Sequence, residues 1–344
     1  MPTVPTDNQV LPSRERDAAQ SGWLQLPPEY AIPETAPSLA EARQYCARLA
    51  HSHYENFSVV TWLLPKRLHQ HFYNVYAYCR ISDDLGDEVP DPQQALALLD
   101  AWESELNATY LSLVEPAPLD IGKNVEELRA DSAGRNRVAP RHPVFIALRE
   151  TIRACNIPRQ PFADLLTAFR QDQTVKRYPT FEDLLGYCRN SANPVGRLVL
   201  YLCGYSDAER QQLSDFTCTA LQLANFWQDV AVDYGKGRIY LPLDELAQYG
   251  VSEEDIASRR YTPQFRALMA FEVERAREWF RRGLPLAGTV DRRLAVDIEL
   301  FSRGGMEILN AIARRDYDVL TARPALSKPR KLWLLARAAV GRLL

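Results

Sequence analysis

The sequence lacks the cysteine spacing that marks structural zinc sites and redox centres. No two of its cysteines form a CxxC pair, and most lie in apolar, helix-like patterns. Such cysteines are typical of reduced, buried thiols in a cytosolic protein. We therefore predict neither a disulfide framework nor a zinc site from the six cysteines, which are Cys46, Cys79, Cys155, Cys188, Cys203 and Cys218.

Long apolar runs and an excess of basic charge are missing as well. No uncharged apolar segment reaches the roughly 18 residues that a membrane span requires. The N-terminal region has no basic stretch followed by an apolar one, so no signal peptide is predicted. The formal net charge of −3 gives no sign of a nucleic-acid partner. We expect a cytoplasmic protein, with peripheral attachment to the inner face of the plasma membrane as the alternative.

Period-two strand patterns are absent too, whereas helical periodicity runs through most of the chain. Residues 1–37 contain seven prolines and are predicted to be a flexible tail without a packed role. One all-α domain, residues 38–344, is predicted to follow. Its expected helices cover 38–49, 66–85, 93–113, 143–154, 161–174, 181–203, 207–231, 263–283, 291–315 and 330–344.

An acidic cluster ends the helix predicted at 66–85. Four carboxylates fall within six residues there, 83–88. On a helix, Tyr76, Arg80, Asp83 and Asp87 lie within roughly 60° of arc, with Asp84 and Glu88 off that face. Side-by-side carboxylates repel each other, so a bound cation would explain why they are kept together. A solvated helix end is the alternative that this cluster alone leaves open.

A second oxygen-rich stripe lies far downstream. Gln222, Asn225, Asp229 and Asp233 are spaced by three, four and four residues, which places them within roughly 80° of arc on one helix. Two helices that face each other with such Asp pairs form a site for hard divalent cations, and Mg²⁺ suits it better than zinc. Because Mg²⁺ recruits phosphate oxygens, the pattern predicts a phosphorylated ligand. Basic side chains that could complete the site are Arg80, Lys236, Arg238 and Arg323.

Aromatic residues accompany both acidic motifs. An apolar, π-rich cavity beyond a diphosphate site suits a prenyl diphosphate, because π faces stabilise a carbocation by up to about 2 kcal/mol each when dry. Plain core packing is the alternative reading for each ring taken singly. The rings in question are Phe57, Phe72, Tyr73, Tyr76, Phe226 and Trp227.

These motifs, with the segment Gly237-Arg-Ile-Tyr-Leu-Pro242, resemble the squalene/phytoene synthase family over residues 38–335. The resemblance implies an isoprenoid-synthase helical bundle around a central cavity. It also implies that Asp83, Asp87, Asp229 and Asp233 hold Mg²⁺, and we assign Tyr76 a catalytic role. The residues that the resemblance places on the diphosphate, its metals or the prenyl ligand are His53, Phe57, Arg80, Gln222, Asn225, Arg238, Tyr317 and Arg323.

Three further segments, 55–59, 168–173 and 187–196, resemble the bacterial hydroxysqualene synthases of hopanoid biosynthesis. That resemblance implies conversion of presqualene diphosphate and water into hydroxysqualene without NADPH. The family usually has Tyr-Val-Ala-Gly where this chain has Asn190-Ser-Ala-Asn193, and Ser-x-Ser-Phe where it has Tyr54-Glu-Asn-Phe57. We hypothesise that Asn190 and Asn193 aim the water that captures the cation. The alternative is that Asn193-Pro194 shapes a helix kink.

Other functions stay open at this point. The same metal motifs would serve head-to-head condensation of two prenyl diphosphates, and a non-catalytic prenyl-binding or assembly protein is a further alternative. Asp172 lies outside both acidic pairs and is either a site residue or a surface acid. Upstream and downstream enzymes of the squalene pathway are expected partners. The basic, apolar segment 330–344 is predicted to be a core helix, with membrane contact as the alternative.

Overall fold

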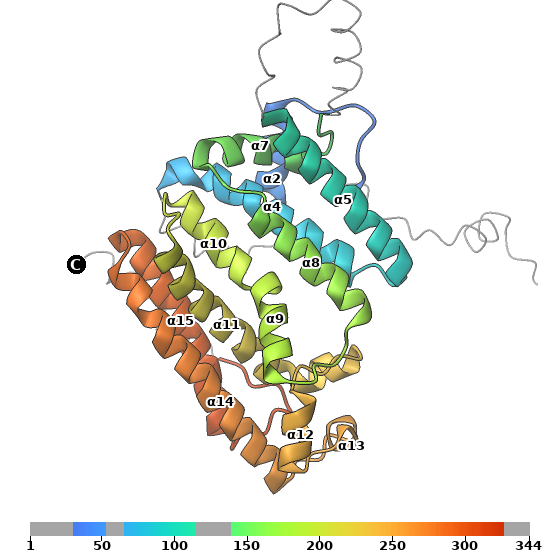
Figure 1. The fold of residues 1–344 in the computed structure, drawn as a ribbon, viewed down its shortest axis with the longest axis vertical. Helices are drawn as coiled ribbons and strands as arrows, with labels where there is room; N and C mark the ends of the chain where they lie inside the picture. The colour runs from blue at the N-terminus through green and yellow to red at the C-terminus, as the bar shows by residue number, and fades with distance from the viewer. Residues whose placement is uncertain (1–29, 53–64, 114–138, 327–344) are drawn as a thin grey trace, which may run out of the picture.

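The computed structural model describes residues 30–52, 65–113 and 139–326, and every regular element within these ranges is a helix (Figure 1). The prediction of an all-α bundle is therefore confirmed. None of these helices is long and apolar enough to cross a membrane. In chain order they are α2 (Leu39–Ser52), α4 (Lys66–Asp87), α5 (Pro92–Leu113), α7 (Pro143–Cys155), α8 (Gln160–Thr174), α9 (Phe181–Ser191), α10 (Asn193–Leu202), α11 (Ala208–Gly235), α12 (Leu243–Tyr249), α13 (Glu253–Ala257), α14 (Pro263–Gly283), the 3₁₀ helix η2 (Leu284–Gly288) and α15 (Arg292–Arg314).

Two large apolar cores hold the bundle together, one built mainly from the N-terminal helices and one mainly from the C-terminal helices. In the first, α4 packs on α2, α5, α7 and α8 around rings such as Tyr78, Trp102 and Phe145. In the second, α11 packs on α9, α10, α14 and α15 around Trp227 and Phe280. Figure 1 shows α8, α9 and α10 joining the two halves. Each half thus buries the apolar face of one motif-bearing helix, α4 or α11.

The single helix predicted over 181–203 is wrong, because the chain breaks into α9 and α10. Ala192, between them, has φ −111° and ψ −50°. Pro194 follows in the first turn of α10, where its missing N–H costs no hydrogen bond, while its ring would clash inside a continuous helix. The break supports the alternative that Asn193-Pro194 shapes the backbone. It also ends α9 at Ser191, with Tyr187 one turn before that end.

Smaller differences between the predicted and the observed elements concern the two ends of the chain and the region that follows α11. The short helices α12 and α13, which follow the segment Gly237–Pro242, were not predicted. Tyr30 falls in the predicted tail but packs against the first core and donates a hydrogen bond of 2.6 Å to Asp84. The predicted helix 330–344 lies outside the described residues.

Asp297 on α15 is a buried acid without a hydrogen-bond partner. It is 2% exposed, and neither carboxylate oxygen is bonded to any part of the chain that the structure describes. Burial, and next the charge of Asp291, raise the pKa of Asp297 to about 8. The folded protein therefore holds a proton that the unfolded chain releases between about pH 4 and pH 8. Asp297 should cost stability progressively as the pH rises through this range.

We expect Asp297→Asn to be more stable than the parent protein by about 1–3 kcal/mol at pH 8, because an amide carries no charge to bury. The difference should shrink at pH 5, where the carboxyl is already neutral in the folded state. Urea unfolding at the two pH values measures both quantities. The exposed Glu299, two residues further along α15, gives the matched control Glu299→Gln. An equal difference at both pH values would contradict the assignment.

Candidate active site

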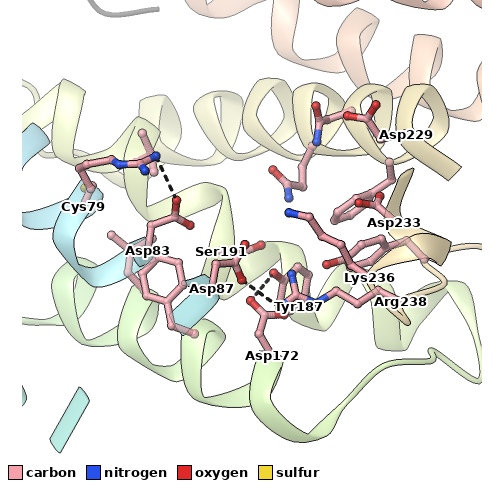
Figure 2. A pocket seen from close by; sticks show the side chains of 18 of the residues that line it. Cys79, Asp83, Asp87, Asp172, Tyr187, Ser191, Asp229, Asp233, Lys236 and Arg238 are labelled. Carbon is pink, nitrogen blue, oxygen red and sulfur yellow. Dashed lines mark hydrogen bonds and ion pairs between the residues drawn. The ribbon is translucent and has the colours of Figure 1, made fainter. Parts of the chain in front are cut away.

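A cavity of about 770 Å³ lies between the two halves of the bundle. Figure 2 shows acidic side chains entering it from opposite walls, with basic and aromatic groups beside them. Its volume falls in the usual range for small-molecule sites, about 300–1,000 Å³. The residues that line it are Ser52, Tyr76, Cys79, Arg80, Asp83, Asp87, Leu165, Phe169, Asp172, Tyr187, Ser191, Val195, Gln222, Asn225, Phe226, Asp229, Val232, Asp233, Lys236, Arg238 and Tyr240.

The four residues that helical spacing places on one face of α4 form one wall of the cavity. Tyr76, Arg80, Asp83 and Asp87 all line the cavity. Burial, followed by the neighbouring charge of Asp87, raises the pKa of Asp83 to about 6. Asp84 lies off this face, as expected, and is buried with Arg80 donating to it at 3.0 Å. Asp83 and Asp87 therefore face the cavity, while Glu88 is exposed at the end of the helix.

The opposite wall is formed by α11. Gln222, Asn225, Asp229 and Asp233 line the same cavity from this one helix. Burial and the charge of Asp229 raise the pKa of Asp233 to about 7. The two Asp pairs, 146 positions apart at Asp83 and Asp229, are thus brought to one space, as the sequence predicts.

In each Asp pair, one carboxylate is bound to an arginine. Arg238 donates to Asp87 at 2.8 Å from the loop that follows α11, in which Gly237 turns the chain with φ 78°. Arg323 binds Asp229 with two N–H groups, of which Nη2 donates to Oδ2 at 2.9 Å. Arg323 contacts this pair without being among the residues that line the cavity.

The Asp carboxylates of the cavity suit Mg²⁺ that is bound together with a phosphorylated ligand. No group of three or more His, Cys, Asp or Glu side chains in the described ranges is close enough to hold a metal ion by itself. Mg²⁺ does not need such a cage, because it keeps waters and is typically bound through one or two carboxylates plus phosphate oxygens. Burial and then the repulsion within each Asp pair raise the pKa values of Asp83 and Asp233, and a bound divalent cation would offset both effects.

An aromatic wall adjoins the acidic groups. Phe226 and Tyr240 stack with ring centroids 3.8 Å apart and planes 11° apart, and Tyr187 lies 5.9 Å from Tyr240. By contrast, Phe72 and Trp227 belong to the cores and do not line the cavity, so core packing is correct for them. Tyr73 packs against the ring of His51, outside the cavity lining.

Several residues predicted for the site lie elsewhere. Neither Asn190 nor Asn193 lines the cavity, and the Asn193 carboxamide oxygen accepts a 2.9 Å hydrogen bond from Thr219. Tyr317 lies off the cavity beneath Arg266, 5.7 Å from its guanidinium carbon. His53 and Phe57 lie outside the described residues. A role for Asn190 or Asn193 stays a prediction, which hydroxysqualene yield from Asn190→Ala and Asn193→Ala would test.

Sequence reasoning missed several polar residues of the cavity or left them unassigned, among them Asp172, Tyr187 and Ser191. Asp172 on α8 is 4% exposed, so the surface-acid alternative is wrong for it. Tyr187 donates to Asp172 Oδ2 at 2.9 Å, and burial raises the pKa of Asp172 to about 6. Ser191 lines the cavity one helical turn after Tyr187. The available signal was spacing, since Leu165, Phe169 and Asp172 share a face of α8, as Tyr187 and Ser191 do on α9.

Comparison with known proteins agrees with this geometry. The family model for squalene/phytoene synthase matches residues 50–330. The chain is 31% identical over 310 residues to 15-cis-phytoene synthase from Synechococcus elongatus, covering 86% of this chain and 91% of that protein.

Two solved structures extend the comparison. Squalene synthase HpnC from Alicyclobacillus acidocaldarius matches with 44% identity and a TM-score of 0.71, covering 81% of this chain and 96% of that one. A dehydrosqualene synthase solved with a ligand shares the fold with a TM-score of 0.72 at 24% identity, over 88% of this chain and 96% of that one. The chain thus belongs to the squalene/phytoene synthase family and is an enzyme of isoprenoid biosynthesis.

Proposed function

We propose that the protein converts presqualene diphosphate and water into hydroxysqualene and diphosphate, in the presence of Mg²⁺ and without NADPH. The observation that supports this choice most directly is the 44% identity to squalene synthase HpnC over nearly its whole length. Identity to the phytoene synthase from Synechococcus elongatus is lower, at 31%. The segment 187–196, which resembles hydroxysqualene synthases in sequence, contributes Tyr187, Ser191 and Val195 to the cavity.

Departure of the diphosphate is assigned to the acidic and basic end of the cavity. Mg²⁺ would be held there by Asp83, Asp87, Asp229 and Asp233, and when bound it supplies positive charge for the leaving group. Arg238 is now paired with Asp87, and it would exchange this carboxylate for phosphate oxygens, which guanidinium binds in the same forked geometry. Lys236, on the same loop, lines the cavity and adds a second cation.

The carbocation left behind would be stabilised by the aromatic wall. The faces of Phe226, Tyr240 and Tyr187 offer π density next to the acidic end. Leu165, Phe169 and Val195 supply apolar surface that limits the access of bulk water. Water must then reach the cation at a defined position, because uncontrolled access would give mixed alcohols.

Head-to-head condensation of two prenyl diphosphates is the second candidate. It is favoured by relatives such as the phytoene synthase from Synechococcus elongatus, and it would use the same acidic residues. The two reactions differ in their substrate. Condensation starts from two prenyl diphosphates, whereas the proposed reaction starts from a presqualene diphosphate that is already formed.

The test supplies purified protein with presqualene diphosphate and Mg²⁺, with and without NADPH, and in parallel with farnesyl diphosphate alone. We expect hydroxysqualene and diphosphate in equal amounts, no effect of NADPH, and no product from farnesyl diphosphate. Squalene formed only with NADPH would overturn the proposal. Presqualene diphosphate formed from farnesyl diphosphate would establish the second candidate.

The proposed chemistry also implies partners. One enzyme must supply presqualene diphosphate, and another must consume an alcohol that is insoluble in water. Peripheral contact with a membrane would help both transfers, and the basic, apolar composition of residues 330–344 suits it. Sedimentation of the full chain with anionic vesicles would support the membrane alternative, and recovery of all the protein in the supernatant would support the predicted core helix.

A further inference from the structure

The proposed reaction contains one step for which no residue has yet been identified. A water molecule must be held beside the cation and must lose a proton as its oxygen bonds to carbon. The two asparagines predicted for this task, Asn190 and Asn193, are absent from the cavity lining. The residue between them on α9, Ser191, does line it.

Ser191 has a hydroxyl group that lacks a partner. Its Oγ is buried and forms no hydrogen bond with any of the described residues. A serine in a helix usually satisfies its hydroxyl on the carbonyl one turn earlier, and a buried hydroxyl left unpaired is destabilising. Because the residue lines the cavity, rotation about χ1 brings this hydroxyl to a molecule bound there.

Tyr187 lies one helical turn before Ser191 and also lines the cavity. Residues four apart lie on the same face of a helix, so both side chains enter the cavity from one side of α9. The Tyr187 hydroxyl already donates to Asp172 at 2.9 Å, so its oxygen can accept a hydrogen bond from a water. Tyr187 also belongs to the aromatic wall, 6.2 Å from Phe226, where the cation is expected.

Asp172 differs from Asp87 and Asp229 in its partners. Arg238 holds Asp87 and Arg323 holds Asp229, whereas a neutral phenol holds Asp172. Its second oxygen, Oδ1, is buried and has no hydrogen-bond partner in residues 30–52, 65–113 and 139–326. A carboxylate whose donor is a neutral phenol is a better proton acceptor than one bound directly to a guanidinium.

We propose that Ser191 and Tyr187 hold the water that captures the carbocation, and that Asp172 receives the proton of this water through Tyr187. In this step a lone pair of the water oxygen forms the C–O bond. One O–H bond of the water breaks, and its proton moves to the Tyr187 oxygen as the phenolic proton moves to Asp172 Oδ2. The carbinol and a neutral Asp172 result, and Asp172 later returns the proton to solvent. The inference rests on the proposed function and assigns its last step.

The test separates ionisation from capture by measuring two products from presqualene diphosphate and Mg²⁺. Released diphosphate reports ionisation, and hydroxysqualene reports capture. The variants are Ser191→Ala, Tyr187→Phe and Asp172→Asn, with Ser191→Thr as the variant that keeps the hydroxyl. Arg189→Ala, which changes an exposed residue on the outer side of α9, is the matched control.

In the parent protein and in Arg189→Ala we expect one hydroxysqualene per diphosphate. In Ser191→Ala, Tyr187→Phe and Asp172→Asn the ratio should fall about tenfold or more, with alkenes from proton loss replacing the alcohol. Ser191→Thr should restore most of the ratio. A merely structural role would lower both products together and leave the ratio at one, which would overturn the inference. Absence of hydroxysqualene from the parent protein would overturn the proposed function and this inference together.

Discussion

Asp83→Asn and Asp229→Asn should each lower turnover of the prenyl diphosphate by about a hundredfold or more, because each removes a charged oxygen from the predicted metal and diphosphate site. The fold should survive both changes. Asp83 is half-buried beside Asp87, and its raised pKa shows that the folded protein opposes its charge. An amide of the same shape removes this opposition, so the melting temperature of Asp83→Asn should equal or exceed that of the parent protein.

For Asp229→Asn the expected stability needs a separate argument, because Asp229 also binds Arg323. Half of the Arg323 side chain is exposed, so loss of this pair should cost no more than about 1 kcal/mol. Steady-state turnover and thermal unfolding, measured on the same preparations, give the two quantities. Glu88→Gln, at the exposed end of α4, is the control and should leave turnover unchanged. Near-parental turnover in both Asp variants would contradict the metal assignment.

The two acidic faces were predictable because helical spacing is a local property. Four residues at three- and four-residue intervals lie on one side of any helix, whatever packs behind it. Tyr76 to Asp87 and Gln222 to Asp233 therefore reached the cavity as predicted. The pairing of the two helices depends on tertiary packing, and only the resemblance to a family supplied it in advance.

Helical spacing alone does not decide which side of a helix faces the cavity, as the segment 190–193 shows. The segment 190–193 was correctly chosen as unusual, but neighbouring helical residues point about 100° apart. The cavity lies on the Ser191 side, so Asn190 and Asn193 face elsewhere. The direction in which α9 faces depends on its break from α10 and on its packing against α8 and α11, which spacing does not encode. Asp172 was ambiguous for the same reason, since its burial depends on Tyr187, fifteen residues away in sequence.

The contacts of Arg275 help to fix the positions of α9 and of the loop that carries Arg238. Arg275 on α14 binds Glu245 of α12 through two hydrogen bonds of 2.6 Å and Glu272 through another of 2.6 Å. Its guanidinium carbon lies 3.4 Å from the ring centroid of Phe181, the first residue of α9. Arg275 thus joins α14 to the helix that carries Tyr187 and to the helix that follows the Arg238 loop.

Arg275→Ala should lower the free energy of unfolding by about 3–5 kcal/mol, because it leaves the buried carboxylate of Glu245 without its cation. Glu245→Gln added to Arg275→Ala should recover part of this loss, since the group that loses its cation is then neutral. Arg281→Ala, on the same helix but in a half-exposed pair with Glu274, should cost no more than about 1 kcal/mol. Urea unfolding measures all three variants. Equal losses in Arg275→Ala and Arg281→Ala would show that burial does not set the strength of this network.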